Sequence, residues 1–244
     1  AILTPKRDEL DLLNYHEINK FFKKENPTVV IIAAAKVGGI LANSEKPAEF
    51  ILQNLKIQTN LIENSFNNGI KRLLFLGSSC IYPKYSKQPI KEEYLLQGDL
   101  EVTNEYYAIA KIAGIKLCES LRKQYSFDAI SLMPTNLYGP NDNYHPRNSH
   151  VMASLIKKFT NAKKENLDAV KCWGTGTPRR EFMHVDDLGK AALFVLENWS
   201  PDDENAPKTE DGELLTYLNV GTGEDISIKD LAKKISFCLL YTSP

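Results

Sequence analysis

The fold of this chain is decided by the stretch Lys71-Arg72-Leu73-Leu74-Phe75-Leu76-Gly77-Ser78-Ser79-Cys80. An uninterrupted apolar run such as 73–76 is typical of a parallel strand that is buried on both faces. We therefore expect a strand over residues 71–77. Because parallel α/β sheets bind their ligands at the carboxyl ends of the strands, Ser78 comes where such a sheet carries functional groups.

The second informative stretch is Tyr107-Ala-Ile-Ala-Lys111. Residues 103–125 are predicted to form a helix, and positions four apart lie on one face of a helix. A phenol, an ammonium group and the strand-end hydroxyl of Ser78, all within reach of one carbonyl, form a set suited to proton transfer, in which Lys111 should favour the phenolate of Tyr107. Tyr106 has no lysine at the matching offset and is the poorer candidate. The alternative is an ordinary surface Tyr–Lys pair beside a turn serine.

Apolar runs alternate with helical patterns along the first part of the chain, which predicts an α/β fold with a parallel sheet and right-handed crossovers. The expected strands cover residues 28–35, 71–77 and 127–133, and the expected helices begin at Pro47 and cover 103–125. After Asn148 the pattern loosens. There we expect helices over 149–164 and about 186–199, strands near 170–173 and 216–220, and a helix from the capping box at 227–230 to about Ile235.

The bulk composition excludes several classes of protein. Apolar residues make up 43% and charged residues 25% of the 244 residues, as in ordinary globular proteins, and the net charge is −1. We therefore expect neither a dedicated nucleic-acid binder nor a membrane protein. The cysteines are scattered without a CxxC pair, which indicates neither a disulfide scaffold nor a metal site and favours a reducing, cytoplasmic setting; they are Cys80, Cys118, Cys172 and Cys238.

Four strings carry a resemblance to a known family: Ala35-Lys36-Val37-Gly38-Gly39-Ile40, Gly77-Ser78-Ser79-Cys80-Ile81-Tyr82-Pro83, Pro134-Thr135-Asn136-Leu137-Tyr138-Gly139-Pro140 and Trp173-Gly174-Thr175-Gly176-Thr177-Pro178. With Tyr107 and Lys111, they resemble the extended short-chain dehydrogenases/reductases and, within these, the GDP-L-fucose synthases. The resemblance implies a Rossmann-like, doubly wound parallel sheet over 1–140 and a smaller C-terminal substrate lobe over 141–235.

The resemblance also implies the reaction. Members of this family convert GDP-4-keto-6-deoxy-D-mannose to GDP-L-fucose by epimerisation at C3 and C5, followed by reduction of the C4 ketone by NADPH. Ser78, Tyr107 and Lys111 would serve the reduction. Cys80 matches the base of the epimerisation and His150 its acid; His145 is the rival acid. The alternatives are a nucleotide-sugar 4-epimerase, a 4,6-dehydratase or a non-catalytic relative. A dehydratase needs an acidic residue beside the serine, and here that neighbourhood offers only Ser79 and Cys80.

The remaining site residues follow from the same resemblance. Arg7 would favour the 2′-phosphate of NADPH over NADH. The residues expected to contact the cofactor are Arg7, Ala34, Ala35, Leu76, Gly77, Ser78, Ser79, Lys111, Pro134, Thr135, Asn136, Leu137 and His150. The residues expected to bind the nucleotide-sugar are Lys158, Trp173 and Arg180. A homodimer is expected through the helix that carries Tyr107 and Lys111.

One departure from the family pattern concerns the cofactor pyrophosphate. Proteins of this fold carry a glycine-rich turn after the first strand. Gly38-Gly39 instead follows a later strand, so we expect the first βαβ unit to be missing and the chain as written to bind cofactor poorly. Residues 236–244 lose the helical period and are expected to be a tail foreign to the protein.

Overall fold

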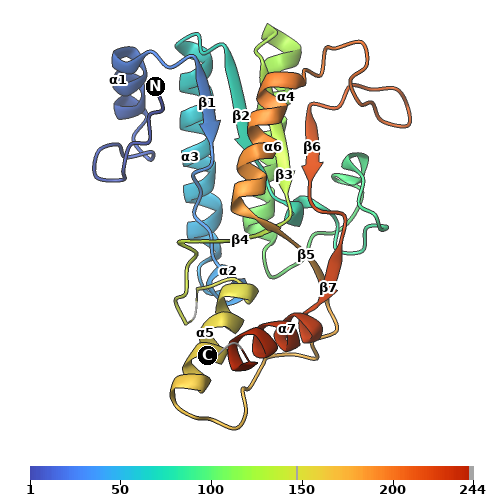
Figure 1. Ribbon diagram of the computed structural model, residues 1–244. Helices are drawn as coiled ribbons and strands as arrows, with labels where there is room; N and C mark the ends of the chain where they lie inside the picture. Colours follow the sequence, from blue (N-terminus) through green and yellow to red (C-terminus); the bar gives the residue numbers. More distant parts are fainter. Residues whose placement is uncertain (147, 242–244) are drawn as a thin grey trace.

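The computed structural model describes residues 1–146 and 148–241. Its main sheet has four parallel strands in the order β1-β2-β3-β6 (Figure 1). These are β1 (Val29–Ile32), β2 (Arg72–Leu76), β3 (Ala129–Pro134) and β6 (Tyr217–Val220). The prediction of a Rossmann-like α/β fold with a parallel sheet is confirmed.

Both faces of this sheet are covered by helices, because alternate side chains of each strand point to opposite faces. Leu73 and Phe75 belong to one core, which the helices α3 (Pro47–Asn67) and α4 (Glu105–Tyr125) cover. Leu74 lies between them in sequence and packs in the opposite core, against α6 (Val185–Asn198). This two-sided burial explains why β2 reads as a continuous apolar run.

The helix α4 approaches the sheet closely at one point. A Cβ atom added to Gly114 would come within 2.6 Å of the Phe75 ring, so no larger residue fits there without movement. Close to this point, the backbone carbonyl of Ala110 accepts a hydrogen bond of 2.5 Å from the buried Gln58 of α3. The helix that carries Tyr107 and Lys111 is therefore held against both the sheet and its neighbouring helix.

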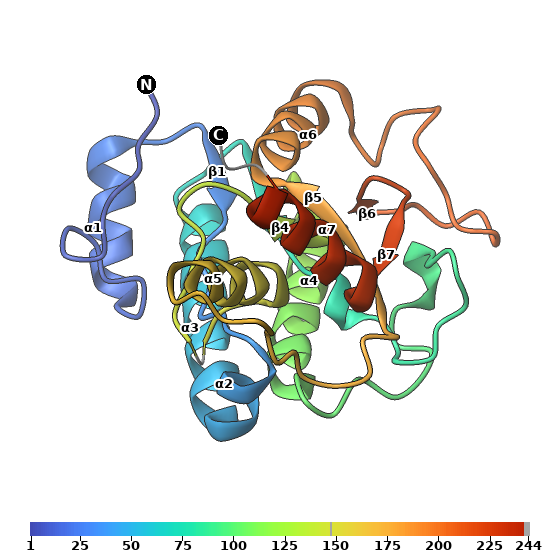
Figure 2. The ribbon, with the colours of Figure 1, turned by 60° about the horizontal axis from the view of Figure 1, so that its bottom comes forward.

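A second layer lies at the carboxyl ends of the main strands. It contains a three-stranded sheet in the order β4-β5-β7, in which β4 pairs parallel and β7 antiparallel with β5. Figure 2 views the molecule from this end, with α5 and α7 in the foreground. The elements are β4 (Asn136–Tyr138), α5 (Val151–Lys164), β5 (Arg179–His184), β7 (Asp225–Ser227) and α7 (Ile228–Tyr241).

The remaining elements are short or peripheral. The helix α1 packs on α3, where the side chain of Asn60 donates to the carbonyl of Leu12 at 3.1 Å. Within the described residues, none of the helices combines the length and the apolar character that crossing a membrane requires. These elements are α1 (Tyr15–Glu25), α2 (Ile40–Glu45) and the 3₁₀ turns η1 (Ser79–Ile81) and η2 (Glu92–Tyr94).

Two predicted strands are corrected. The strand expected over 28–35 ends at Ile32, and residues 33–39 leave the sheet because the side chain of Asn54 on α3 replaces the ladder, accepting from the Lys36 amide at 2.8 Å and donating to its carbonyl at 3.0 Å. The strand expected near 170–173 does not form. In that segment the carbonyl of Lys171 accepts from the Lys158 side chain at 3.3 Å instead of from a neighbouring strand.

The last helix is also longer than expected. The prediction that it stops near Ile235 is wrong, since α7 continues to Tyr241. Lys163 of α5 donates to the carbonyl of Leu239 at 2.5 Å, which satisfies a carbonyl in the last turn of α7 with a cation where the helix dipole favours one. Of the tail expected over 236–244, residues 242–244 lie outside the described residues.

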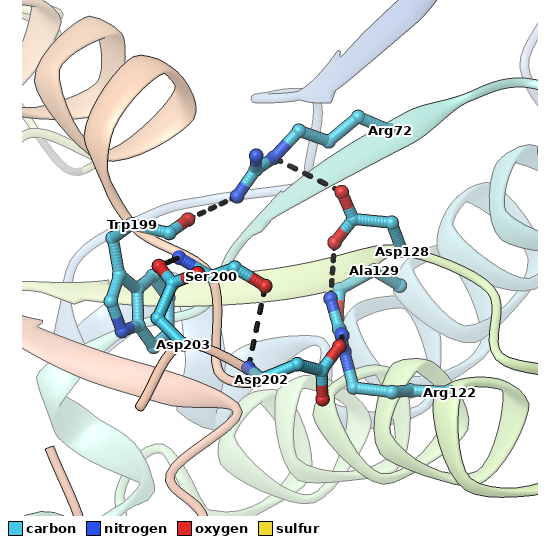
Figure 3. A network of polar contacts seen from close by, with 8 residues as sticks. All are labelled: Arg72, Arg122, Asp128, Ala129, Trp199, Ser200, Asp202 and Asp203. Atoms are coloured by element: carbon cyan, nitrogen blue, oxygen red, sulfur yellow. Dashed lines mark hydrogen bonds and ion pairs between the residues drawn. The ribbon is translucent and has the colours of Figure 1, made fainter. Parts of the chain in front are cut away.

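The amino ends of β2 and β3 carry a network of ion pairs (Figure 3). Asp128 contacts both Arg72, at 3.4 Å, and Arg122 of α4. Arg122 also donates to the carbonyl of Ala129 at 3.2 Å and to the carboxylate of Asp202 at 2.6 Å. This network ties the last turn of α4 to the start of β3 and to the segment after α6.

Candidate functional site

The turn after β2 presents a hydroxyl and a thiol side by side. Ser78 is the residue before η1, and its Oγ accepts from the Cys80 amide at 3.4 Å. The Oγ of Ser78 and the Sγ of Cys80 lie 3.0 Å apart. Gly77 lets this turn approach β3, because a Cβ atom there would come within 2.4 Å of the Met133 sulfur.

The helix α4 brings two further groups to this turn. The phenol of Tyr107 lies near the Ser78 hydroxyl, close enough for that hydroxyl to lower its pKa. Lys111 is 3% exposed, and its Nζ donates to the carbonyl of Leu76 at the end of β2, at 2.7 Å. The same Nζ lies 4.7 Å from the ring centre of Phe75 and 5.9 Å from that of Tyr107. The structure thus gathers four of the five predicted catalytic residues, Ser78, Cys80, Tyr107 and Lys111, at the carboxyl end of β2.

Burial shifts the pKa values of all three titratable groups in this cluster. It raises the pKa of the Cys80 thiol, while the Ser78 hydrogen bond and the charge of Lys111 lower it. It also raises the pKa of Tyr107, together with the charge of Cys80 and against the effect of the Ser78 hydroxyl. Lys111 has no part in this shift, so the expected lowering of the Tyr107 pKa by Lys111 is not found. Burial lowers the pKa of Lys111 from 10.5 to about 8, because a charged ammonium is costly away from water.

The fifth predicted catalytic residue lies on another element. His150 is exposed and precedes α5, where its backbone carbonyl accepts from the Ser154 amide at 2.9 Å. Among the described residues, no hydrogen bond or ion pair links His150 to Ser78, Cys80 or Tyr107. The rival acid, His145, lies five positions earlier in the same exposed loop.

Most of the expected cofactor contacts line the carboxyl end of the main sheet. Ala34 and Ala35 are half-buried small residues after β1, and 76–79 form the end of β2 and the turn after it. The segment 134–137 leads from β3 into β4. The side chains of Thr135 and Asn136 both donate to the carbonyl of Glu181, at 2.9 and 3.0 Å, so they also connect the two sheets.

The Lys111 ammonium at this end of the sheet has the donors that a sugar-bearing ligand needs. An ammonium group has three N–H donors, and the one described hydrogen bond of Lys111, to Leu76, leaves donors for ribose hydroxyls. Arg7 lies in an exposed turn before α1, and among the described residues no contact links it to Ala34 or Ala35.

Two of the three expected substrate residues lie together. The Nζ of Lys158 on α5 is 4.7 Å from the ring centre of Trp173, whose side chain is 71% exposed. Arg180 is exposed on β5 and donates to the carbonyl of its neighbour Arg179 at 2.7 Å. No described contact joins Arg180 to the other two.

Sequence reasoning missed Glu181, a residue of β5 whose carboxylate holds a neighbouring loop in place. Its carboxylate accepts from the amide of Thr222, and from the amide of Gly223 at 2.8 Å, and thereby fixes the loop between β6 and β7. A Cβ atom at Gly221 would lie 2.1 Å from that carboxylate. A carboxylate flanked by Arg179-Arg180 and Phe182 gives no local signal for this role, because its partners lie some forty positions away.

A parallel sheet whose carboxyl end gathers serine, tyrosine and lysine defines the class of Rossmann-like dinucleotide-binding proteins. The sequence profile of the NAD dependent epimerase/dehydratase family matches residues 3–206. The chain belongs to this family.

Individual relatives show which proteins of this family the chain is similar to. The chain is 53% identical over 227 residues to a putative GDP-L-fucose synthase 2 from Arabidopsis thaliana, covering 93% of this chain and 65% of that protein. It is 52% identical over 243 residues to the GDP-L-fucose synthase of Escherichia coli (strain K12), covering 96% and 72%. The chain thus spans slightly less than two thirds of the first plant relatives, at 65% and 66% of their lengths.

Solved structures give the same fold. A GDP-mannoheptose C4 reductase from Campylobacter jejuni with NADP bound superposes with a TM-score of 0.86 at 39% identity, covering 99% of this chain and 76% of that one. A GDP-L-fucose synthetase from Naegleria fowleri bound to NADP gives a TM-score of 0.81 at 25% identity, covering 99% and 70%.

Proposed function

We propose that the protein converts GDP-4-keto-6-deoxy-D-mannose to GDP-L-fucose, using NADPH. The observation that carries this proposal is the thiol of Cys80, which lies 3.0 Å from the hydroxyl of Ser78 within the Ser–Tyr–Lys cluster. A ketone reductase needs the hydroxyl, phenol and ammonium groups alone. A thiol beside them supplies a base for proton abstraction next to the ketone.

In the epimerisation, Cys80 removes a proton from the carbon next to the C4 ketone, and the electron pair delocalises onto the ketone oxygen as an enolate. A proton returned to the opposite face of the same carbon completes the inversion, so the proton count is unchanged. His150 is proposed as the donor, and its exposure lets it regain a proton from water. Burial raises the pKa of Cys80, and the Ser78 hydrogen bond and the charge of Lys111 offset part of that rise in favour of the thiolate.

In the reduction, Ser78 and Tyr107 donate hydrogen bonds to the C4 oxygen. Bound NADPH supplies the hydride that the carbonyl carbon takes up. The raised pKa of Tyr107 keeps its proton in place until the negative charge develops on the C4 oxygen, which then takes that proton. Lys111 stabilises the phenolate that remains and donates to the ribose of the cofactor.

The residues around the second sheet are proposed to hold the nucleotide. Trp173 offers an exposed aromatic face, with the Lys158 ammonium 4.7 Å above it, and Arg180 supplies a guanidinium for a phosphate or ribose. We propose that 141–235 forms the substrate lobe, with α6 and β6 as crossover elements that return to the main sheet, and that Arg7 selects NADPH. Arg7→Ala should then weaken NADPH binding about tenfold more than NADH binding, and equal losses would reject that role.

The protein is proposed to act as a cytoplasmic homodimer through α4. Three apolar side chains on the paired helices are open to solvent, namely Tyr106 at 46%, Ile109 at 38% and Leu52 at 53% exposure. The solution mass of the full-length protein tests the dimer.

The proposal is tested by incubating the full-length protein with NADPH and GDP-4-keto-6-deoxy-D-mannose. We expect one NADPH to be oxidised for each GDP-L-fucose formed. A nucleotide-sugar 4-epimerase would return the 4-epimer without net cofactor consumption, and a 4,6-dehydratase would act on GDP-mannose itself. Either of those results, or no turnover, would reject the proposed function.

A further inference from the structure

We propose that Tyr82 is a positioning residue for the epimerisation: by anchoring the turn η1 to strand β6, it holds the Cys80 thiol in place. The inference rests on the proposed function, because it assigns Cys80 the role of base. The anchor is the hydrogen bond from the Tyr82 Oη to the Oδ1 of Asn219, at 2.6 Å.

The anchor is needed because η1 is held weakly by its own backbone. Its two described turn bonds, from the amide of Ile81 to the carbonyl of Ser78 and from the amide of Tyr82 to the carbonyl of Ser79, are 3.3 and 3.4 Å long. Both exceed the usual N–H···O distance of about 2.9–3.0 Å. A 3₁₀ turn also has poorer hydrogen-bond geometry than an α-helix. Cys80 lies in the middle of this turn, so its sulfur depends on what fixes the ends.

Tyr82 closes the carboxyl end of the turn and is buried, with 4% exposure. Its aromatic body belongs to the same core as Ile81 and Phe75. Burial raises the pKa of Tyr82, so the phenol keeps its proton and acts as a hydrogen-bond donor throughout the working range of pH. Its acceptor, Asn219, lies 137 positions further along the chain.

Asn219 is a rigid acceptor because three independent contacts hold it. It pairs with Met133 in the ladder between β6 and β3. Its backbone amide donates to the Glu92 carboxylate at 2.7 Å, and its Nδ2 donates to the carbonyl of Ile90 at 3.0 Å. The Asn219 side chain is thus oriented with its oxygen toward Tyr82, and the main sheet itself fixes the Cys80 turn.

This connection separates the two half-reactions. Tyr107 and Lys111 come from α4, which is held to the sheet at Phe75 and Leu76 and to α3 at Gln58, by contacts that do not involve the Tyr82 bond. Ser78 lies just before the turn, next to Gly77, whose amide donates to the carbonyl of Leu132 on β3 at 2.8 Å. Loss of the anchor should therefore displace the thiol in the middle of the turn, while Tyr107, Lys111 and the strand end that carries Ser78 stay in place. A misplacement of about 1 Å at a reacting atom can cost on the order of 10²-fold in rate.

Tyr217 is a matched control within the same network. It is a buried tyrosine on β6, and its Oη donates to the backbone carbonyl of Glu92 at 3.1 Å. Tyr217→Phe removes a tyrosine hydroxyl from the same core, as Tyr82→Phe does, but this hydroxyl has no bond to the Cys80 turn.

The first measurement is amide hydrogen exchange of this chain. Tyr82→Phe should speed exchange of the 79–82 amides at least about fivefold, while β3 amides stay unchanged and Tyr217→Phe leaves 79–82 within about twofold of wild type. Asn219→Ala removes the acceptor from the other side and should have the same effect, and the double variant should add nothing further. Unchanged exchange of 79–82 in both single variants would overturn the anchor.

The second measurement follows chemistry in the full-length protein. Tyr82→Phe should slow solvent deuterium exchange at C3 and C5 of the sugar about tenfold or more, while hydride transfer from GDP-L-fucose to NADP, run in reverse, stays within about twofold. Equal losses in both would reject the positioning role. If wild type itself exchanges no deuterium, the proposed function fails, whereas the amide-exchange contrast still decides whether the anchor exists.

Discussion

The amino and carboxyl ends of the main sheet differ in how their charged side chains are paired. At the amino end, Arg72 and Arg122 face Asp128, and Arg122 also reaches Asp202 (Figure 3). At the carboxyl end, Lys111 is 3% exposed and donates to a backbone carbonyl, and among the described residues no carboxylate forms an ion pair with it.

The difference shows which end is built for stability and which for chemistry. Paired charges at the amino end tie the last turn of α4 to the start of β3 and to the segment after α6. The buried cation at the carboxyl end lacks such a partner, and its pKa falls to about 8. Groups with perturbed pKa values cluster at functional sites because reactivity near neutral pH requires them. Substitutions at the two ends should therefore have separable effects.

The largest effect is expected from Tyr107→Phe at the carboxyl end. Loss of the phenolic proton should lower NADPH oxidation on the keto sugar by about 10³-fold, within the range for a general acid. Tyr125→Phe is the control, because Tyr125 is 54% exposed at the other end of the same helix, and it should stay within about twofold of wild type. Unchanged turnover in Tyr107→Phe would remove the phenol from the reaction.

At the amino end, Arg122→Ala should cost about 3 kcal/mol of unfolding free energy, because it leaves the partly buried Asp128 with one cation instead of two. Urea denaturation measures the loss. Lys116→Ala, which breaks an exposed pair with Glu119 on the same helix, should cost less than about 0.5 kcal/mol. The assignment of the amino end to stability would be contradicted if Arg122→Ala lowered the specific activity of the folded protein while its stability stayed normal.

Cys80→Ser should separate the two half-reactions. A hydroxyl is a much poorer base than a thiolate near neutral pH, so epimerisation should slow about 10²-fold. NADPH affinity should remain normal, as binding titrations can show. If Cys80 serves only packing, the variant would instead lose stability and keep its specific activity.

Lys111→Met tests the cost of the lone buried cation. Because its folded pKa, about 8, lies below the ordinary 10.5, the unfolded chain binds the proton more tightly, and the charged lysine opposes folding most fully below pH 8. The variant should gain about 2 kcal/mol of stability at pH 7, and the gain should shrink as the pH rises from 8 toward 10.5. Urea denaturation at pH 7 and at pH 9.5 measures the gain in stability at each pH.

Lys157→Met on the exposed face of α5 is the control and should change the stability by no more than about 0.5 kcal/mol. A loss of stability at pH 7 would contradict the assignment.

Much of the fold could be predicted from the sequence, because β2 and α4 are each indicated by a pattern within their own residues. The run 73–76 indicates a strand buried on both faces, and the pairing of Tyr107 with Lys111 follows from helical spacing. The early end of β1 could not be predicted, since it depends on the distant side chain of Asn54. The hydrogen-bond partner of Tyr82 could not be predicted either, because Asn219 is 137 positions away in the sequence.

The candidate site was predicted to a similar extent. Contacts near in sequence, such as that between Ser78 and Cys80, follow from the turn itself. The position of His150 depends on how α5 sits over the carboxyl end of the sheet, which no local pattern encodes, and its role as acid stays a prediction.

The most direct test of the account is the position of deuterium in the product formed in D₂O by the full-length protein with NADPH. If Cys80 exchanges protons next to the ketone and the hydride comes from the cofactor, GDP-L-fucose should carry solvent deuterium on C3 and C5 and protium on C4. A product without deuterium at C3 and C5 would contradict the claim that thiol, hydroxyl, phenol and ammonium act on one sugar in one pocket.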